Sequence, residues 1–225
     1  MKKHLHCIAL LLGLLFCGHA MAVEEPKFDV LVSDGPFEVR KYAPVLVAET
    51  LVEGDMDEAS NKGFRLIADF IFGNNQVANP SNTTNTTSSE KIAMTAPVVV
   101  TPQSAKIAMT APVTVLPHSA GADMQSANQW WVQFIMPSQY TLANIPKPKN
   151  SAVRLREVAP QHFVVLKYSG FNTLSRVQLK TQEAIDWMTK QQLKPIGTPQ
   201  LARYDPPWTL PMFRRNEIMI EIAAP

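Results

Sequence analysis

The chain has 225 residues, of which 46% are hydrophobic, and it carries 21 Lys and Arg against 19 Asp and Glu. This length and apolar content are sufficient for one domain with a sizeable core. A charge balance so close to neutral excludes the strongly basic overall field by which a protein is held on nucleic acid or on an anionic membrane.

Residues 1–22 have the pattern of a secretory signal peptide. Lys2 and Lys3 give a charged start, an apolar run extends from Ile8 to Phe16, and Ala20-Met21-Ala22 is an A-x-A cleavage site. The segment is too short and wrongly flanked for a membrane span. We therefore expect export to the periplasm, cleavage after Ala22, and a single mature domain over residues 23–225.

Cleavage changes the chemistry of the chain. Cys7 and Cys17 both lie in the removed segment, so the mature protein can form no disulfide and its stability must come from packing. A lipoprotein anchored at Cys17 is disfavoured because bulky Phe16 precedes that cysteine. Loss of Lys2 and Lys3 from the 21 basic residues leaves 19 basic against 19 acidic residues.

The first part of the mature chain reads as three strands and a helix. Strands are predicted at 28–33, 37–41 and 44–53, the first two separated by the turn Asp34-Gly35-Pro36. A helix is predicted from Asp55 to Phe72, because Asp55 can cap its start, Glu58 can complete a capping box, and Gly73-Asn74 can end it.

The apolar surface of this helix is wider than one sheet requires. Its core stripe is formed by Ala59, Gly63, Leu66, Ile67 and Phe70, and three further apolar residues extend it to roughly 200° of the circumference: Phe64, Ala68 and Ile71. The extra apolar surface could be covered by the protein's own loops. Alternatively, Phe64 and Ala68, edged by Asn61 and Arg65, line a ligand groove.

A repeated octapeptide follows a polar loop predicted at 74–90. The sequence Lys-Ile-Ala-Met-Thr-Ala-Pro-Val occurs at 91–98 and again at 106–113. Strand alternation places Met94 on the same face as Ile92 and Ala96, whether it packs in the core or contacts a ligand. Met109 holds the equivalent place in the second copy.

The rest of the chain reads as further strands and a second helix. The helix is predicted from Asn172, which can cap it, to Gln192, and Ile145–Lys149 reads as a linker. Strands are predicted at the remaining apolar or alternating segments: 129–136, 153–158, 162–168, 198–204 and 217–222.

A second, weaker repeat organises these elements into halves. Arg40-Lys41-Tyr42-Ala43-Pro44 and Arg156-Glu157-Val158-Ala159-Pro160 share R-x-x-A-P, and a strand, a glycine and a helix follow each. Two strand–helix–strand–strand halves would pack as a pseudo-symmetric α+β pair. Such a pair has a natural cleft where the halves meet, and clefts are where small ligands bind.

With these motifs in view, the chain resembles the SOUL/heme-binding protein family. The resemblance spans nearly all of the mature chain in order, and it is carried by both octapeptides and by five other segments: Phe37–Tyr42, Gly54–Gly73, Trp131–Pro137, Tyr168–Phe171 and Arg203–Ile218. It implies a distorted antiparallel β-barrel flanked by two helices and related to bacterial effector-binding domains. It also implies binding of heme or another tetrapyrrole, without enzymatic activity, in an apolar groove beside the first helix.

The chain departs from that family at the proposed iron ligand. Some members carry a His directly after the Tyr of the R-x-Y segment, and Ala43 stands there in this chain. Near the helix positions that hold heme in the family, Asp69 would repel a propionate and only Arg65 has the favourable charge. The expected ligand site therefore holds a porphyrin by apolar contacts and lacks a strong axial ligand. Its candidate residues are Tyr42, Asn61, Phe64, Arg65, Ala68, Met94, Met109 and Trp208.

Other kinds of site have little support in the sequence. Only His118 and His162 survive signal cleavage, and both read more simply as a loop residue and a strand residue than as iron ligands. No nucleophile elbow, metal-binding His/Cys motif or phosphate-binding loop is present in the sequence, so we expect no metal site and no catalysis. Two alternatives stay open: a binding or scavenging module for other hydrophobic small molecules, and an envelope protein that uses the repeated segment as a contact surface.

Overall fold

The structure is a computed structural model that describes residues 24–76, 111–117, 127–205 and 208–225. The predicted signal peptide, the first octapeptide, and residues 106–110 of the second copy lie outside the described residues. Three residues of the second copy are described, and the last of them, Val113, begins strand β5.

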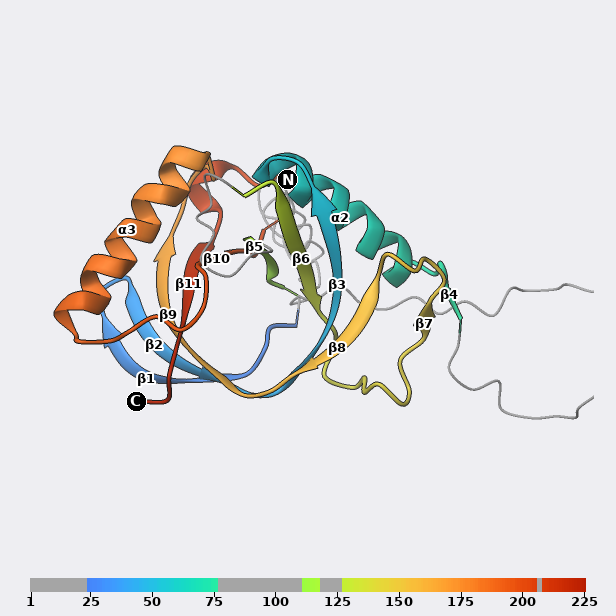
Figure 1. Ribbon diagram of the computed structural model, residues 1–225, viewed down its shortest axis with the longest axis horizontal. Helices are drawn as coiled ribbons and strands as arrows, with labels where there is room; N and C mark the ends of the chain where they lie inside the picture. Colours follow the sequence, from blue (N-terminus) through green and yellow to red (C-terminus); the bar gives the residue numbers. More distant parts are fainter. Residues whose placement is uncertain (1–23, 77–110, 118–126, 206–207) are drawn as a thin grey trace, which may run out of the picture.

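The described chain contains two long helices, one short 3-10 helix and eleven strands (Figure 1). The helices are α2 (Met56–Ile71), α3 (Leu174–Lys190) and η1 (Pro211–Phe213). The strands are β1 (Phe28–Asp34), β2 (Phe37–Tyr42), β3 (Val45–Glu53), β4 (Asn75–Gln76), β5 (Val113–Pro117), β6 (Gln129–Ile135), β7 (Lys147–Pro148), β8 (Arg154–Val158), β9 (Gln161–Tyr168), β10 (Gln200–Arg203) and β11 (Asn216–Ile222).

Nine of these strands form one antiparallel, strongly curled sheet, in the order β1-β2-β9-β11-β10-β5-β6-β3-β8. Outward from the boundary between β10 and β5, the order is β10, β11, β9, β2 on one side and β5, β6, β3, β8 on the other. Strands at the same place in the two series are equivalent: β10 with β5, β11 with β6, β9 with β3, and β2 with β8. Apart from the outermost strands, they belong to two halves, β3-α2-β5-β6 and β9-α3-β10-β11. The predicted α+β fold of two strand–helix–strand–strand halves, curled as part of a barrel and flanked by two helices, is confirmed.

The R-x-x-A-P repeat occupies equivalent places in these halves. Arg40 of β2 pairs with Phe163 of β9, and Arg156 of β8 pairs with Val47 of β3. In each half the Ala-Pro pair lies where the chain leaves one strand and enters the next. The repeat thus marks the point at which the chain passes from the outer strand of one half to the strand that precedes the helix of the other half.

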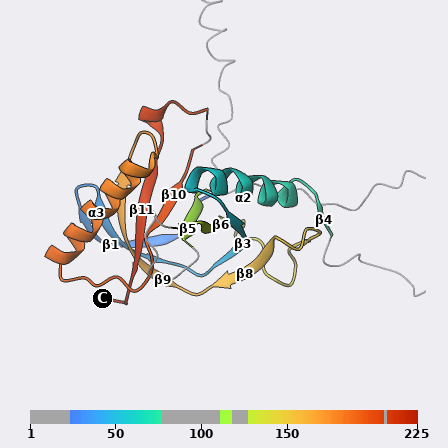
Figure 2. The same cartoon turned by 45° about the horizontal axis from the view of Figure 1, so that its top comes forward.

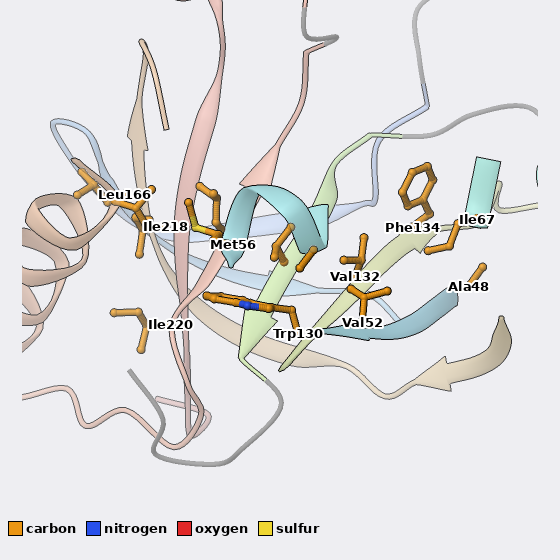
Figure 3. Packing of buried hydrophobic residues seen from close by; sticks show 14 of the residues in the cluster. Ala48, Val52, Met56, Ile67, Trp130, Val132, Phe134, Leu166, Ile218 and Ile220 are labelled. Carbon is orange, nitrogen blue, oxygen red and sulfur yellow. The ribbon is translucent and has the colours of Figure 1, made fainter. Parts of the chain in front are cut away.

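Both helices pack on one face of the sheet, α2 on β3 and β6 and α3 on β9 and β11 (Figures 1 and 2). The main core lies between the helices and this face. Figure 3 shows part of it, where Met56 and Ile67 of α2 meet strand residues: Val52, Trp130, Val132 and Phe134. The opposite face of the sheet carries a second, smaller cluster of Tyr42, Phe163, Val165, Ala202 and Met219.

Helix α2 begins and ends where its sequence predicts. The Asp55 carboxylate accepts hydrogen bonds from the backbone N–H groups of Asp57 and Glu58, at 3.0 and 2.8 Å. Its last residue is Ile71, and Gly73 then adopts a φ of 123°, a conformation that costs other residues far more than glycine. The predicted cap and stop are both confirmed.

Two local predictions need correction. Helix α3 is capped by Thr173, whose hydroxyl accepts from the Arg176 N–H, and not by Asn172. The Asn172 side chain is engaged elsewhere, because it accepts from the Tyr168 hydroxyl and donates to Asn216, each at 2.6 Å. The segment 145–149 is not only a linker, since β7 within it pairs with β4 at the start of the predicted polar loop.

Candidate functional site

One face of α2 carries four of the predicted binding residues. Phe64 and Arg65 lie three and four positions after Asn61, and Ala68 lies four and three positions after them, so all four share one face of the helix. Phe64 is 37% exposed, and its ring lies 5.4 Å from that of Phe134, tilted by 55°. Asn61 and Arg65 are exposed and Ala68 is buried. We call these four residues the α2 face.

The close approach of α2 to the sheet sets the position of this face. Gly63 points toward β6, and a Cβ added to it would lie 2.5 Å from side-chain carbons of Val132. No larger residue fits there without a shift, so glycine lets the helix rest directly on the strand. Phe64, the next residue, is thereby held against Phe134 at the edge of the same contact.

The chemistry of the α2 face suits a tetrapyrrole held by apolar contacts and one cation. Phe64 and Ala68 supply apolar surface, and Arg65 supplies a guanidinium that could meet a propionate. Of the two histidines that follow the predicted signal peptide, His162 lies on β9, on which α3 packs, and His118 lies outside the described residues. Among the residues that the structure describes, the α2 face therefore has no histidine neighbour suited to axial ligation.

The structure does not bring all the predicted binding residues to this face. Met94 and Met109 lie outside the described residues. Trp208 follows β10 in the connection to β11 and is 83% exposed. That connection starts beside α2, because Arg203, the last residue of β10, pairs with Asp57 in the first turn of the helix at 3.1 Å.

Tyr42 lies on the opposite face of the sheet. Its hydroxyl accepts from Arg40 at 2.9 Å, and its ring contacts Phe28 and Phe163 at 5.2 and 5.7 Å between centroids. Burial raises the pKa of Tyr42 to about 12, so it stays a neutral phenol at ordinary pH. It contributes there to a charged cluster that the sequence analysis did not anticipate.

The centre of that cluster is a buried ion pair between Arg40 and Glu217. The guanidinium is 1% exposed and the carboxylate 0%, and two N–H groups of Arg40 meet the two carboxylate oxygens at 3.0 and 3.1 Å. Arg40 also donates to Glu38 at 2.6 Å. Glu217 accepts further from Tyr204 and Arg215. Burial alone would lower the pKa of Arg40, but its phenol and carboxylate neighbours raise it above the ordinary value.

The sequence contains one signal that could have located this cluster. In β2, Glu38, Arg40 and Tyr42 alternate with Phe37 and Val39, so one strand presents a fully polar side to a sheet face. All three polar residues are buried. A polar side on a strand that lies between two other strands indicates partners within the fold, although the sequence does not name them.

A second buried carboxylate serves the other half of the molecule. Glu49 of β3 is 0% exposed and accepts from Arg154 at 2.6 Å and from Arg156 at 3.0 Å, both on β8. Arg154 also lies over the ring of Trp131, 4.0 Å from its centroid. The first arginine of each R-x-x-A-P segment thus forms an ion pair with a buried glutamate. Arg40 pairs with Glu217 on β11, and Arg156 pairs with Glu49 on β3.

These carboxylates predict how stability depends on pH. Burial alone would raise the pKa of Glu38 and of Glu49. Hydrogen bonds and charges of Lys167 and Arg40 instead lower the pKa of Glu38 below the ordinary 4.5. Those of Arg156 and Arg154 lower the pKa of Glu49 in the same way. Because the folded pKa is depressed, their stabilisation is present above about 4.5 and is lost as the pH falls through the folded values.

We therefore expect the free energy of unfolding to be nearly constant from about pH 7 to 5 and to decrease below about pH 4.5. Denaturant unfolding measured at several pH values checks this. In the Glu49→Gln variant the decrease should be shallower, because one linked proton is removed. If the free energy of unfolding of the Glu49→Gln variant decreased below about pH 4.5 as steeply as that of the wild-type protein, the role given to Glu49 would be contradicted.

One cavity is formed away from α2. It has a volume of about 160 Å³ and lies between the N-terminal segment 24–27, the β2–β3 connection 43–46, and residues 135–140. Sites for drug-sized ligands usually have volumes of about 300–1,000 Å³. The cavity includes none of the predicted binding residues, and its size suits a smaller molecule than a porphyrin.

Two features of the described residues bear on other kinds of site. No group of three or more His, Cys, Asp or Glu side chains in that part of the chain is arranged to hold a metal ion. None of the helices there is both long and apolar enough to cross a membrane.

Comparisons with known proteins agree with this architecture. A family model described as SOUL heme-binding protein matches residues 23–221. No match was found among curated proteins.

Among solved structures, the crystal structure of the EcmrR C-terminal domain is similar with a TM-score of 0.55 at 11% identity, covering 84% of this chain and 98% of that one. A structure described as a hydrolase from Listeria innocua has a TM-score of 0.51 at 12% identity, covering 83% and 91%. At such low identity these likenesses show a shared fold and nothing about chemistry.

Proposed function

This chain belongs to the SOUL heme-binding protein family, and from that premise we propose that it binds heme or a related tetrapyrrole beside α2, without catalysing a reaction. The proposal places the molecule in the periplasm, after removal of residues 1–22. The ligand would lie along the α2 face, against Phe64 and Ala68. Arg65 would meet a propionate, and the iron would receive no strong ligand from the protein.

The single observation that supports this location best is the partial exposure of Phe64. A Phe on a helix that packs on a sheet usually lies in the core, yet this one remains 37% exposed while its ring contacts Phe134. A partly exposed aromatic beside a guanidinium offers both a flat apolar contact and a counter-charge. A porphyrin with propionates has the matching pair of properties.

Titration of the mature protein with hemin, and with iron-free protoporphyrin as a second probe, tests the proposal. We expect a shifted Soret band that saturates near one equivalent, and similar affinities for the two ligands because the iron is unligated. Much tighter binding of hemin would show an axial ligand and contradict that part of the proposal. Absence of saturable binding by either ligand would contradict the function itself.

Substitution on α2 locates the site. Phe64→Asp should weaken hemin binding at least tenfold, because it replaces an aromatic contact by a charge that repels propionates. Leu179→Asp on α3, where Leu179 is 59% exposed, introduces the same charge on the equivalent helix and should leave affinity unchanged. Thermal melts of both variants separate lost binding from lost folding. Unchanged hemin binding in a folded Phe64→Asp variant would remove α2 from the site.

A further inference from the structure

The octapeptide repeat belongs to a longer tandem repeat that includes β5. Residues 91–105 and 106–120 align without a gap and differ at only three positions: Val99 against Thr114, Thr101 against Leu116, and Gln103 against His118. Strand β5 (Val113–Pro117) lies within the second copy and has the sequence Val-Thr-Val-Leu-Pro. Residues 98–102 have the sequence Val-Val-Val-Thr-Pro at the equivalent place in the first copy. The chain therefore carries two versions of one strand.

The place that β5 occupies is central to the sheet. β5 pairs with β10 on one side and with β6 on the other, so it joins the two halves. Val115 lies opposite Leu201 and Val132, and all three residues are 0% exposed in the main core. The sheet is continuous only when a strand fills this place, and only one of the two copies can fill it at a time.

The side of β5 that faces the main core has the same residues in both copies. Val115 is part of that core, Val113 packs against it, and Pro117 is buried at the end of the strand. Strand alternation places these three residues on one side. The first copy has the same residue types at the equivalent positions: Val98, Val100 and Pro102. An exchange of copies would therefore leave the core with the same side chains.

The two differences within the strand lie on the opposite face of the sheet. The Thr114 hydroxyl donates to the Gln133 amide oxygen at 3.4 Å, which is a long hydrogen bond. Val99 has nearly the same shape as threonine and would lose only this bond. Leu116 is half-buried, and Thr101 in its place would lose part of the apolar contact. Because Val and Thr are both favoured in strands, the first copy is only a slightly weaker version of β5.

The connections on either side of the strand allow both arrangements. In the structure, residues 77–112 connect β4 to β5, and residues 118–128 connect β5 to β6. After an exchange, these connections would be residues 77–97 and 103–128. The entropic cost of closing a loop grows only with the logarithm of its length, so this redistribution changes the relative populations about twofold or less. The connection that becomes shorter could still extend about 70 Å, which is well beyond the length of α2.

We propose that the two copies exchange in the place of β5, with residues 98–102 replacing residues 113–117 in a minor arrangement of the folded protein. The spare copy then lies after the strand instead of before it. Met94 takes the place of Met109, so the predicted binding residues ahead of the strand remain the same. The exchange therefore changes which end of the strand carries the spare copy and preserves the rest of the fold. It does not depend on the proposed tetrapyrrole site.

Substitution in the core tests whether the first copy can replace β5. In the mature chain without residues 91–105, Val115→Asp should abolish cooperative thermal unfolding, because it buries a carboxylate and no second strand is present. In the full mature chain, the same substitution should lower Tm by only about 2–8 °C, because residues 98–102 take over. Val100→Asp alone should leave Tm unchanged, and Val100→Asp with Val115→Asp should prevent folding.

Cysteine pairs detect the exchange in a chain with both copies intact. Thr114 lies directly opposite Gln133, at a separation that a disulfide can bridge. Thr114→Cys with Gln133→Cys should cross-link rapidly under a mild oxidant, and Val99→Cys with Gln133→Cys at an initial rate about five- to thirtyfold lower. In the control pair, Val100→Cys with Gln133→Cys, the first cysteine would face the main core, and little cross-linking is expected. Equal rates for the Val99→Cys and Val100→Cys pairs would contradict the exchange.

Three further results would overturn the proposal. The first is that Val115→Asp has the same effect on Tm with and without residues 91–105. The second is that the mature chain without residues 106–120 fails to fold, since it must use residues 98–102. The third is that full-length Val115→Asp folds only as a concentration-dependent dimer in sedimentation, because the strand would then come from a second copy. All these measurements report folding, so a failure of hemin binding would contradict the proposed function without affecting this inference.

Discussion

Replacing Arg40 by methionine should lower the free energy of unfolding by about 3 kcal/mol, within the range of about 3–5 kcal/mol for removal of one partner from a buried ion pair. Arg40 is 1% exposed and bonds Glu217, which is 0% exposed, through two N–H groups. Methionine keeps much of the side-chain volume but leaves the carboxylate short of its principal counter-charge. We expect the lower end of the range because Arg215 and Tyr204 still donate to Glu217.

The other half of the molecule provides the matched control. Arg154 also binds a buried glutamate, Glu49, but its side chain is 56% exposed and Arg156 binds the same carboxylate. Arg154→Met should therefore cost no more than about 1 kcal/mol. Denaturant unfolding at neutral pH gives both values. Adding Glu217→Gln to Arg40→Met should recover part of the loss, since no unpaired charge then remains. Equal losses in the two single variants would contradict the assignment of Arg40 as the central cation.

The fold was largely predictable because local signals and the internal repeat agree. Asp55 and Gly73 mark the ends of α2, and apolar or alternating segments mark eight of the eleven described strands within two residues, all except β4, β5 and β7. The R-x-x-A-P segments identify equivalent points of two halves, and the sheet order then follows the same symmetry. Consistency between local and global signals of this kind is what makes a sequence specify one fold.

The charged cluster could not be predicted because its partners are distant in sequence. Arg40 and Glu217 are 177 positions apart, and their contact depends on how β2, β9 and β11 come together. The cap of α3 was missed for a related reason. Asn172 and Thr173 are both suitable caps, and tertiary bonds to Tyr168 and Asn216 determine that Thr173 takes the role.

The candidate site was predictable only in part. Helical spacing alone places Asn61, Phe64, Arg65 and Ala68 on one face, which the structure confirms. Tyr42 was grouped with them through resemblance, but strand alternation directs it to the face of the sheet that carries Arg40 and Glu217. A family resemblance indicates which residues belong to a site. The face of the sheet or helix on which each side chain lies must be predicted from the periodicity of its own strand or helix.

Substitution of Gly63 by a larger residue should also lower the free energy of unfolding strongly, because the added side chain would push α2 away from the sheet. A Cβ at this position would lie 2.5 Å from Val132 side-chain carbons, closer than such atoms can remain. Alanine and leucine favour helices over glycine by up to about 1 kcal/mol, but overpacking a core usually costs about 1–3 kcal/mol. At this position the steric cost exceeds the gain in helix propensity, so the larger residue destabilises the protein.

We therefore expect Gly63→Leu to lower the free energy of unfolding by about 3 kcal/mol, whereas Lys62→Leu, at an exposed neighbouring position, should change it by at most about 0.5 kcal/mol. Gly63→Ala should cost less, and Val132→Ala should partly rescue Gly63→Ala by removing the carbons that its Cβ meets. Denaturant unfolding of the four combinations at 63 and 132 measures this coupling. Hemin titration of Gly63→Ala adds a functional readout, because a displaced helix moves Phe64 relative to Phe134. Independent, additive losses at the two positions would show that the helix can shift without strain, and the close contact would then not be what holds the α2 face in place.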